Sequence, residues 1–535
     1  MEQHQSEPWI WWKHGVIYHI YPRSFMDSNG DGIGDIQGII SKLNYLVDLG
    51  IDGIWLSSVF LSPMVDFGYD VSDYRQIDPV YGTLEDFKML VEKSHSLGLG
   101  IITDMILNHT SDQHPWFLES RASTGNPKRD WYIWKDGNNG GPPNNWKTAV
   151  AGSAWEFDET TGQYYCHSFF KEQPDLNWRN PALAGALFKE LEFWLDFGVD
   201  GFRLDVINFI VKDKIFRNNP YFFGIPLFQR HIFTRNRPKS HKIVRELRNL
   251  VDQYKDRVIV GEIYTLPPGN SRIAASYLAN GSGMHMAFDF SLIFRNWNAR
   301  KYFECIHEGY RHIPERGWPC NVLSNHDLFR SIDRFPWRRH KVEKAKVAAA
   351  LLLTLKGTPF IYYGEEIGMR NSRIRYRDIQ DPLGKRFWPF FSGRDKARTP
   401  MQWNSGENAG FTAVRPWLPV NADAIKRNVE NQEKDRKSLL NFYRLLIKIR
   451  KSHPALQHGR WVPLITGQNG ILAYARIYND QRIVVILNFT GRKKRIFLPE
   501  HNFGYVLFST HRRLNEIFYF QNLWIFPFEV SIYKA

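Results

Sequence analysis

Cysteine is scarce in this chain of 535 residues, which contains only Cys166, Cys305 and Cys320 and no CxxC pair. A disulfide framework or a thiolate metal site needs cysteines at regular spacings, so neither is expected. The odd number fits a reducing compartment, and we expect a cytoplasmic protein. The first residues, MEQHQSEPWIWWKHG, lack the basic start and apolar run of a signal peptide. No apolar run of about 18 residues occurs, so no membrane partner is expected.

Acidic residues are the minority, since 55 Asp and Glu stand against 70 Lys and Arg and the net charge is +15. The basic residues form short scattered groups such as WRRHK and GRKKR, without any nucleic-acid-binding motif. We therefore expect a solvated basic surface and no nucleic-acid partner. Aromatic residues, by contrast, make up 15% of the chain. Most of them would fill a core, but flat ligands such as sugar rings become candidates as well.

Short apolar runs alternate with amphipathic helical stretches from Val16 onward. A helix is predicted after Thr83, which can cap it, and another after Asn180, where Pro181 stands in the first turn and Gly198 follows the last leucine. Strand and helix alternating eight times indicate a (β/α)₈ barrel, an α/β fold. The predicted strands are VIYHIY, IDGIWLSS, LGIITDMIL, VDGFRLDV, DRVIVGEIY, GMHMAFDF, CNVLSN and TPFIYYG.

Two stretches depart from this alternation. Residues 108–179 after the third strand are too long for a simple loop and contain the turn-rich KDGNNGGPPNNW, so we expect an inserted subdomain there. Short alternating runs without long helices begin at residue 459, which predicts a C-terminal antiparallel β domain over 459–535. The barrel would then consist of residues 1–107 and 180–458.

Chemistry in such a barrel sits where the strands end. The polar side chains at the predicted strand ends are Asp104, His109, Arg203, Asp205, Glu262, His326 and Asp327. Any one of them could belong to a structural ion pair, but several carboxylates at one mouth are costly unless their charge is used. Arg203 lies two places before Asp205, on the same strand face, where it should keep that carboxylate ionised. A pair of carboxylates is what glycoside hydrolysis requires.

The blocks DMILNH, GFRLD, GEIY and SNHD, in this order, resemble the four signature regions of the α-amylase family of glycoside hydrolases. The segments QPDLN, GTPFIYYGEEIGM and GRDKARTPMQW are similar to its α-glucosidase and oligo-1,6-glucosidase branch. The resemblance extends over most of the chain. It implies that Asp205 is the nucleophile, Glu262 the general acid and base, and Asp327 a stabiliser of the transition state. It also implies retention of anomeric configuration, with the two carboxyl groups roughly 5 Å apart.

The resemblance implies further contacts with the sugar. Asp66 and Arg394 would grip the far end of the terminal glucose and close the pocket, while Tyr69 would stack on the ring. Val206 would lie next to the leaving sugar, where members that prefer α-1,6 links tend to carry valine. The expected substrate-binding residues are Asp66, Tyr69, His109, Phe170, Arg203, Val206, His326 and Arg394.

The stretch DSNGDGIGD places oxygen-bearing residues at every second position. Its spacing is typical of the start of an EF-hand loop, but Gly38 stands where the bidentate glutamate belongs and a strand is predicted upstream. The resemblance implies a static clip for one calcium or magnesium ion, away from the catalytic residues, and an acidic turn without metal is the alternative. The expected ligands are Asp27, Asn29, Asp31, Ile33 through its carbonyl, and Asp35.

These features together predict a retaining, exo-acting α-glucosidase that acts on short oligosaccharides, leans to α-1,6 links, and is a monomer or homodimer. Within the same fold, an α-1,4-preferring α-glucosidase or transglucosylase and a sucrose isomerase are the alternatives. The segment LFRSIDRF after Asp327 differs from the arginine-rich loop associated with isomerases. A non-catalytic amylase-like scaffold is the alternative from another class.

Overall fold

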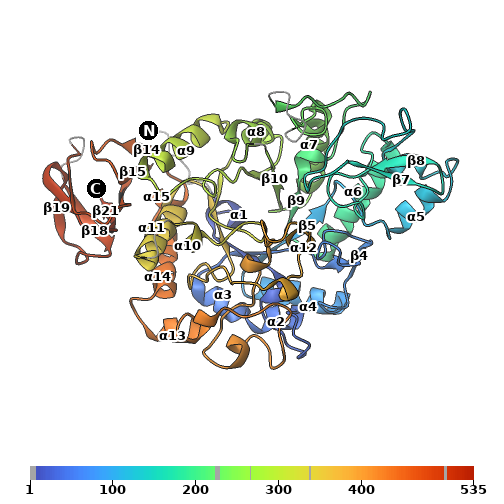
Figure 1. The fold of residues 1–535 in the computed structure, drawn as a ribbon. Coiled ribbons are helices and arrows are strands. Elements are labelled where there is room, and N and C mark those ends of the chain that lie inside the picture. Colours follow the sequence, from blue (N-terminus) through green and yellow to red (C-terminus); the bar gives the residue numbers. More distant parts are fainter. Residues whose placement is uncertain (1–7, 223–228, 266, 336–338, 499–502) are drawn as a thin grey trace.

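A parallel sheet of eight strands forms the centre of the molecule (Figure 1). The computed structural model describes residues 8–222, 229–265, 267–335, 339–498 and 503–535. The strand order is β11-β10-β9-β5-β2-β1-β13-β12, and its two outer strands lie beside each other, so the sheet closes into a barrel. The strands are β1 (Ile17–Ile20), β2 (Gly53–Leu56), β5 (Gly100–Ile106), β9 (Gly201–Asp205), β10 (Val258–Glu262), β11 (Met286–Phe288), β12 (Cys320–Val322) and β13 (Thr358–Tyr362).

Each of these strands falls inside one of the eight predicted runs, so the predicted barrel is confirmed. Helices follow the strands and cover the outside of the barrel (Figure 1). They include α2 (Ile36–Ser41), α3 (Leu43–Leu49), α4 (Leu84–Ser96), α6 (Pro181–Phe197), α7 (Pro238–Val251), α8 (Ser271–Ser276), α9 (Ala299–His312), α11 (Lys341–Thr354) and α14 (Leu439–Ser452).

The predicted helix signals act as expected. Thr83 and Asp86 form a reciprocal capping box at the start of α4. Asn180 caps α6, and Gly198 ends it in the left-handed conformation (φ 109°), which glycine adopts without strain. Leu183, Leu187, Leu191 and Leu195 of α6 are buried, as their spacing predicts.

The chain between β5 and α6 contains the helix α5 (Pro115–Ala122) and a small antiparallel sheet. This sheet has the order β6-β8-β7, from β6 (Trp134–Lys135), β7 (Trp155–Asp158) and β8 (Gln163–Cys166). In Figure 1 it lies on the right, opposite the C-terminal strands. A second small sheet, β3 (Phe60–Leu61) with β4 (Asp73–Ile77), follows β2, and the sequence did not predict it.

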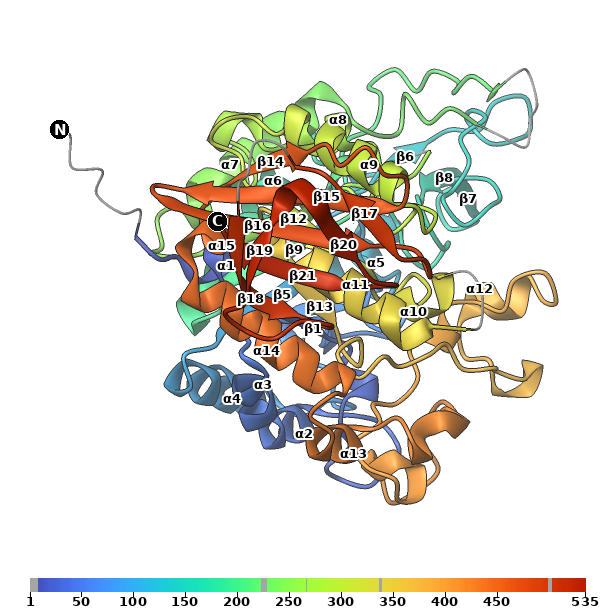
Figure 2. The same cartoon turned by 90° about the vertical axis from the view of Figure 1, so that its left-hand side faces the viewer.

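The C-terminal strands form an antiparallel sheet that packs against one side of the barrel (Figure 2). Its order is β14-β15-β16-β21-β18-β19, and β17 pairs separately with β20. The bounds are β14 (Arg460–Leu464), β15 (Ile471–Tyr478), β16 (Gln481–Asn488), β17 (Lys494–Ile496), β18 (Phe503–Ser509), β19 (Ile517–Tyr519), β20 (Leu523–Ile525) and β21 (Val530–Lys534). This confirms the predicted C-terminal β architecture.

One buried arginine joins the barrel to this sheet, and a second lies within the barrel part of the chain. Arg476 of β15 donates to the carbonyl oxygens of Thr354 (2.7 Å) and Gly459 (3.0 Å). Arg450 of α14 donates to those of Leu353 (2.9 Å) and Gly357 (2.7 Å). Main-chain oxygens thus accept hydrogen bonds from both guanidinium groups.

A long connection after β13 was also not predicted. It runs from Tyr363 to Ser438 with only short helices, among them α12 (Pro382–Arg386) and α13 (Val429–Lys434), and it returns over the mouth of the barrel. In the described part of the chain, no helix combines the length and apolar character that crossing a membrane requires.

Candidate active site

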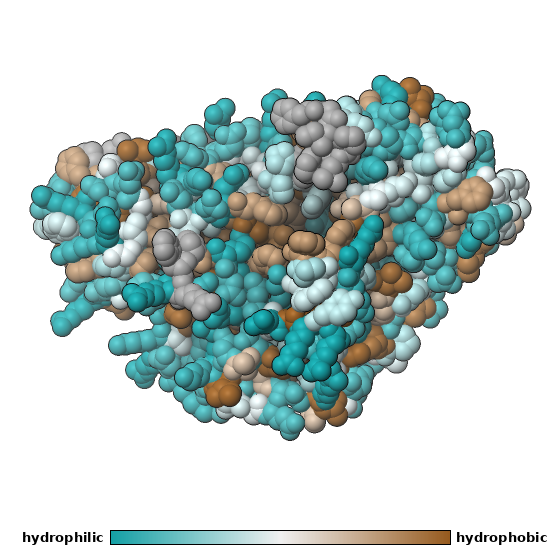
Figure 3. All heavy atoms as spheres, in the orientation of Figure 1, coloured by the Kyte–Doolittle hydropathy of each residue, from teal (hydrophilic) through white to brown (hydrophobic). Residues whose placement is uncertain are grey.

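A cavity of about 240 Å³ opens at the carboxyl ends of the barrel strands. In Figure 3 it lies in the hollow near the centre of the visible face. Most of the predicted site residues line it, namely Asp66, Tyr69, His109, Phe170, Asp205, Val206, Glu262, Asp327 and Arg394. Residues from seven separate segments of the chain therefore converge on one cavity at the carboxyl ends of the barrel strands.

The guanidinium group of Arg203 connects the carboxylates on the barrel side. Its Nη1 lies 2.7 Å from Asp205 and 3.3 Å from Asp104, and its Nη2 contacts Glu262. Arg203 is 1% exposed and lies behind the cavity wall, so it orients these carboxylates from beneath. Asp205 and Glu262 are thus held on the two arms of one rigid fork.

Burial dominates the protonation of these two carboxyl groups. It raises the pKa of Glu262 to about 8, against the lowering effect of Arg203. It also raises the pKa of Asp205 to about 6. Arg203 lowers the pKa of Asp205, but desolvation outweighs that ion pair. The order of the two pKa values still leaves Asp205 ionised and Glu262 protonated at neutral pH.

Asp327 has the opposite electrostatic character. Burial raises its pKa, but His326, Arg394 and Arg398 outweigh burial and hold the pKa well below its usual range. Arg398 Nη2 lies 2.8 Å from the carboxylate and Arg394 Nη1 lies 3.4 Å from it. A permanent negative charge therefore faces the cavity.

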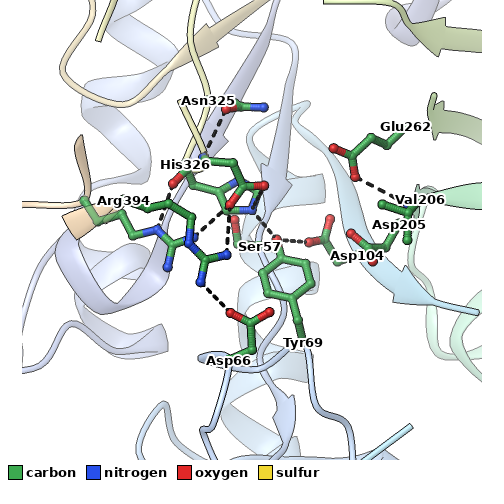
Figure 4. A network of polar contacts seen from close by, with 12 residues as sticks. Ser57, Asp66, Tyr69, Asp104, Asp205, Val206, Glu262, Asn325, His326 and Arg394 are labelled. Carbon is green, nitrogen blue, oxygen red and sulfur yellow. Dashed lines mark hydrogen bonds and ion pairs between the residues drawn. The ribbon is translucent and has the colours of Figure 1, made fainter. Parts of the chain in front are cut away.

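Arg394 and Asp66 line one side of the cavity, which we call its inner end. Its Nη2 lies 2.6 Å from Asp66 and 2.9 Å from Asp381, and its backbone N–H also donates to Asp381 (2.6 Å). Figure 4 shows Arg394 reaching across to Asp66. Segments more than 300 residues apart thus form the predicted pair.

Tyr69 forms part of the cavity wall. Its hydroxyl group donates to Asp104 (2.5 Å) and lies 2.7 Å from Nε2 of His326 (Figure 4). The Tyr69 and His326 rings are stacked, with centroids 5.3 Å apart. His326 is only 1% exposed and lies behind Tyr69, outside the cavity lining.

His109 and Gln173 form the neighbouring wall. His109 Nε2 lies 3.0 Å from the Tyr69 carbonyl oxygen, and Gln173 Nε2 donates to the same oxygen (3.2 Å). Burial lowers the pKa of His109 to about 4, so its imidazole is neutral. Sequence reasoning missed Gln173 as a site residue, although it opens the QPDLN segment used for the resemblance.

Aromatic side chains dominate the outer part of the cavity. Tyr264 and Phe294 are partly exposed there, at 36% and 43%. The aromatic lining consists of Phe169, Phe170, Tyr264, Phe290, Phe294 and Phe391. Apart from Phe170, none of them was predicted, because isolated aromatic residues in loops follow no period. Arg398 and Asp381 were missed for the same reason.

Val206 occupies a backbone conformation that is unusual for a β-branched residue, with φ 34° and ψ 43°. Its N–H group donates to Glu262 Oε2 over 3.3 Å (Figure 4). The turn places Val206 on the cavity wall between the two carboxylates.

In the predicted metal-binding loop, side-chain oxygens accept hydrogen bonds from backbone N–H groups of the same loop. Asp27 accepts from the N–H groups of Gly30 (2.7 Å) and Gly32 (2.9 Å). Asp35 accepts from Gly38 N–H (2.6 Å) and caps α2. Within the described ranges, no three His, Cys, Asp or Glu side chains gather as a metal site. Calcium or magnesium binding, which would also use Asn29 and the Ile33 carbonyl, stays a prediction.

Comparison with known proteins agrees with this geometry. The model of the α-amylase catalytic domain matches residues 19–459. The oligo-1,6-glucosidase of Parageobacillus thermoglucosidasius is 39% identical, over 98% of this chain and 99% of its own length. A probable α-glucosidase of Rhizobium meliloti is 42% identical, over 91% of both chains.

Solved structures give the same picture. The α-glucosyl transfer enzyme XgtA has a TM-score of 0.93 at 38% identity, covering 99% of this chain and all of its own. A mutant of the trehalulose synthase MutB has a TM-score of 0.91 at 36% identity, with the same coverage. This chain therefore belongs to the α-amylase family of glycoside hydrolases.

Proposed function

We propose that the protein is a retaining α-glucosidase that removes single glucose units from the non-reducing ends of short α-linked oligosaccharides. The observation that carries this proposal is the cavity itself. Asp205 and Glu262 both form ion pairs with the guanidinium group of Arg203. The ion pair between Arg394 and Asp66 would block the inner end of the cavity. A blocked end admits one terminal sugar and excludes the middle of a polymer.

The two carboxyl groups divide the chemistry. Asp205, ionised at neutral pH, attacks the anomeric carbon, while Glu262 donates its proton to the departing glycosidic oxygen. The C–O bond to the leaving sugar breaks as the bond to Asp205 forms. Glu262, now ionised, then takes a proton from water, which attacks the anomeric carbon and releases glucose with its configuration retained.

Asp327 and the inner residues bind the sugar and its developing charge. The permanently ionised Asp327 stabilises positive charge at the sugar ring in the transition state. Asp66 and Arg394 present a carboxylate and a guanidinium group to the far hydroxyls, with Tyr69 beside the ring and His109 close by. In this proposal Arg203 and His326 support that surface from behind.

The leaning to α-1,6 links rests on Val206 and on the relatives named oligo-1,6-glucosidase. The Val206 side chain offers an apolar surface, against which the exocyclic methylene of a 1,6-linked partner can lie. An α-1,4 preference is the alternative. A non-catalytic scaffold is disfavoured, because all three carboxylates line the cavity.

Transfer to a second sugar is a further candidate activity, because both solved relatives are named for reactions other than simple hydrolysis. The aromatic outer cavity can seat a sugar acceptor in competition with water. Sucrose isomerisation would use the same covalent intermediate.

We also propose a cytoplasmic location, since Cys166, Cys305 and Cys320 are all free thiols.

A panel of isomaltose, maltose, sucrose, trehalose and starch tests the function. We expect release of glucose from isomaltose with the highest kcat/KM, slower cleavage of maltose, and no attack on starch. Proton NMR of early product should show α-glucose. Rapid shortening of starch, or β-glucose as the first product, would contradict the proposal.

A further inference from the structure

The segment that supplies Leu383 to the cavity lining is strongly basic. Residues 370–390 contain six basic side chains, Arg370, Arg373, Arg375, Arg377, Lys385 and Arg386, against only two acidic ones, Asp378 and Asp381. Asp381 is fully buried and paired with Arg394, so its charge does not reach the surface. We call the exposed side chains of Arg373, Arg375, Arg377, Lys385 and Arg386 the basic rim.

Two members of the basic rim lack a compensating charge. Ser372 and Ile374 are buried while Arg373 and Arg375 are exposed, an alternation that sends both guanidinium groups out on one side of the chain. Neither Arg373 nor Arg375 forms an ion pair with any residue in the described ranges. Arg377, by contrast, lies 3.9 Å from Asp378.

The basic rim is fixed to the cavity wall. The N–H of Ser372 donates to the carbonyl oxygen of Lys396 (2.9 Å), two residues after Arg394. Helix α12 carries Leu383, which lines the cavity, and ends with Lys385 and Arg386.

Arg386 reaches the opposite side of the mouth. Its Nη2 lies 3.5 Å from where a Cβ on Gly152 would be, and Ala149 and Val150 of the same loop line the cavity. Arg386 therefore stands beside a loop that forms part of the cavity lining.

Aromatic surface accompanies this charge. Tyr376 and Trp388 are 56% and 41% exposed, and their rings lie 5.6 Å apart. Figure 3 shows apolar surface around the hollow and hydrophilic side chains gathered below it. A ring can pack on such a platform while a carboxylate or phosphate on that ring meets the guanidinium groups.

We propose that the preferred substrates are α-glucosides whose leaving group is a ring bearing an anionic group. This inference rests on the proposed α-glucosidase function and specifies its substrate class. The inner end selects the neutral glucose, whereas the basic rim attracts the charged end and raises the rate of productive encounter.

The test compares 4-carboxyphenyl α-glucoside with its neutral twin, 4-carbamoylphenyl α-glucoside. We expect kcat/KM for the anionic substrate to be higher by about fivefold at low ionic strength and the advantage to vanish near about 0.5 M NaCl. The 4-carbamoylphenolate is a better leaving group than the 4-carboxyphenolate, so the intrinsic reactivity alone would favour the neutral twin.

Variants locate the effect. In Arg373→Gln/Arg375→Gln/Arg386→Gln the advantage should disappear while kcat/KM for the neutral twin stays within about twofold. The matched control, Arg492→Gln/Lys493→Gln/Arg495→Gln on the C-terminal sheet, should keep it. Calorimetry with both glucosides on the Asp205→Asn variant measures binding without turnover and should show the same difference.

The outcomes separate the two proposals. Equal kcat/KM and equal affinity for the twins would overturn this inference alone, as would an advantage that survives in the rim variant. If no α-glucoside is cleaved, the proposed function fails, and calorimetry with the same twins then decides whether the basic rim binds anions.

Discussion

The inner and outer ends of the cavity are built in opposite ways. At the inner end, charged groups are paired at short distances, as in the contacts of Arg394 with Asp66 and Asp381. At the outer end, aromatic rings predominate and polar partners are few. Ion pairs and hydrogen bonds fix one orientation of one sugar, whereas flat apolar surfaces accept many rings. The difference indicates strict recognition of glucose and tolerance toward the leaving group.

The largest effect is expected at the boundary between the two ends. Asp205→Asn keeps the shape of the side chain but cannot attack the anomeric carbon, so kcat on an aryl α-glucoside should fall by about 10³-fold or more. The thermal unfolding midpoint should change little. A loss of less than about tenfold would show that another group is the nucleophile.

The inner end is tested by Arg394→Gln, which leaves Asp66 and Asp381 without their shared cation. We expect kcat/KM for every α-glucoside to fall by about 100-fold, regardless of the leaving group. Arg415→Gln is the matched control, because this arginine is 87% exposed and pairs only at the surface with Asp378. If the fall in kcat/KM of Arg394→Gln depends on the leaving group, the two ends of the cavity do not act separately, which would contradict the prediction.

The pH profile tests the electrostatics of the carboxylate pair. Activity requires ionised Asp205, with a pKa of about 6, and protonated Glu262, with a pKa of about 8. The rate should therefore fall below pH 6, where Asp205 gains a proton, and above pH 8, where Glu262 loses one. Outside this window kcat/KM should drop about tenfold per pH unit, with both limbs belonging to the coupled pair. A profile without an alkaline limb would refute the role of Glu262.

Linkage preference should respond to the outer side of the same site. Val206→Thr adds a hydroxyl group beside the leaving sugar, and we expect the ratio of kcat/KM for isomaltose over maltose to fall by about tenfold. Val150→Thr, at another point of the cavity lining, should leave the ratio unchanged. If both variants keep the parent ratio, Val206 does not select the linkage.

The smallest effect concerns the loop at Asp27–Asp35, outside both ends of the cavity. If it binds calcium or magnesium, chelation should lower the unfolding midpoint by a few degrees and change the rate of the folded enzyme by less than about twofold. Asp31→Ala should make the protein insensitive to the chelator. Elemental analysis that finds neither ion in purified protein would contradict the metal clip.

Sequence reasoning succeeded where a repeating physical constraint exists. The strands β9 and β10 are apolar runs that end in Asp205 and Glu262, so these carboxylates could be assigned to strand ends in advance, and Asp327 follows β12 after a short link. Arg394 was predicted only through the family resemblance, and its partner Asp381 was not predicted. Both lie in the long connection after β13, whose path is set by tertiary contacts. Burial likewise exceeded the pairing effect at Asp205, because desolvation depends on the whole surroundings rather than on a neighbour in sequence.

The buried arginine between the barrel and the C-terminal sheet bears on how the chain can be divided. Arg476 belongs to β15, yet one of its acceptors is Thr354 at the end of α11. Cutting the chain at the start of the sheet would remove that donor and uncover the apolar surface it crosses. The change of pattern in the sequence therefore marks where the architecture changes, but the two parts should still unfold as one cooperative unit. Exchanging this sheet between relatives would require that Arg476 and the main chain at Thr354 be transferred together.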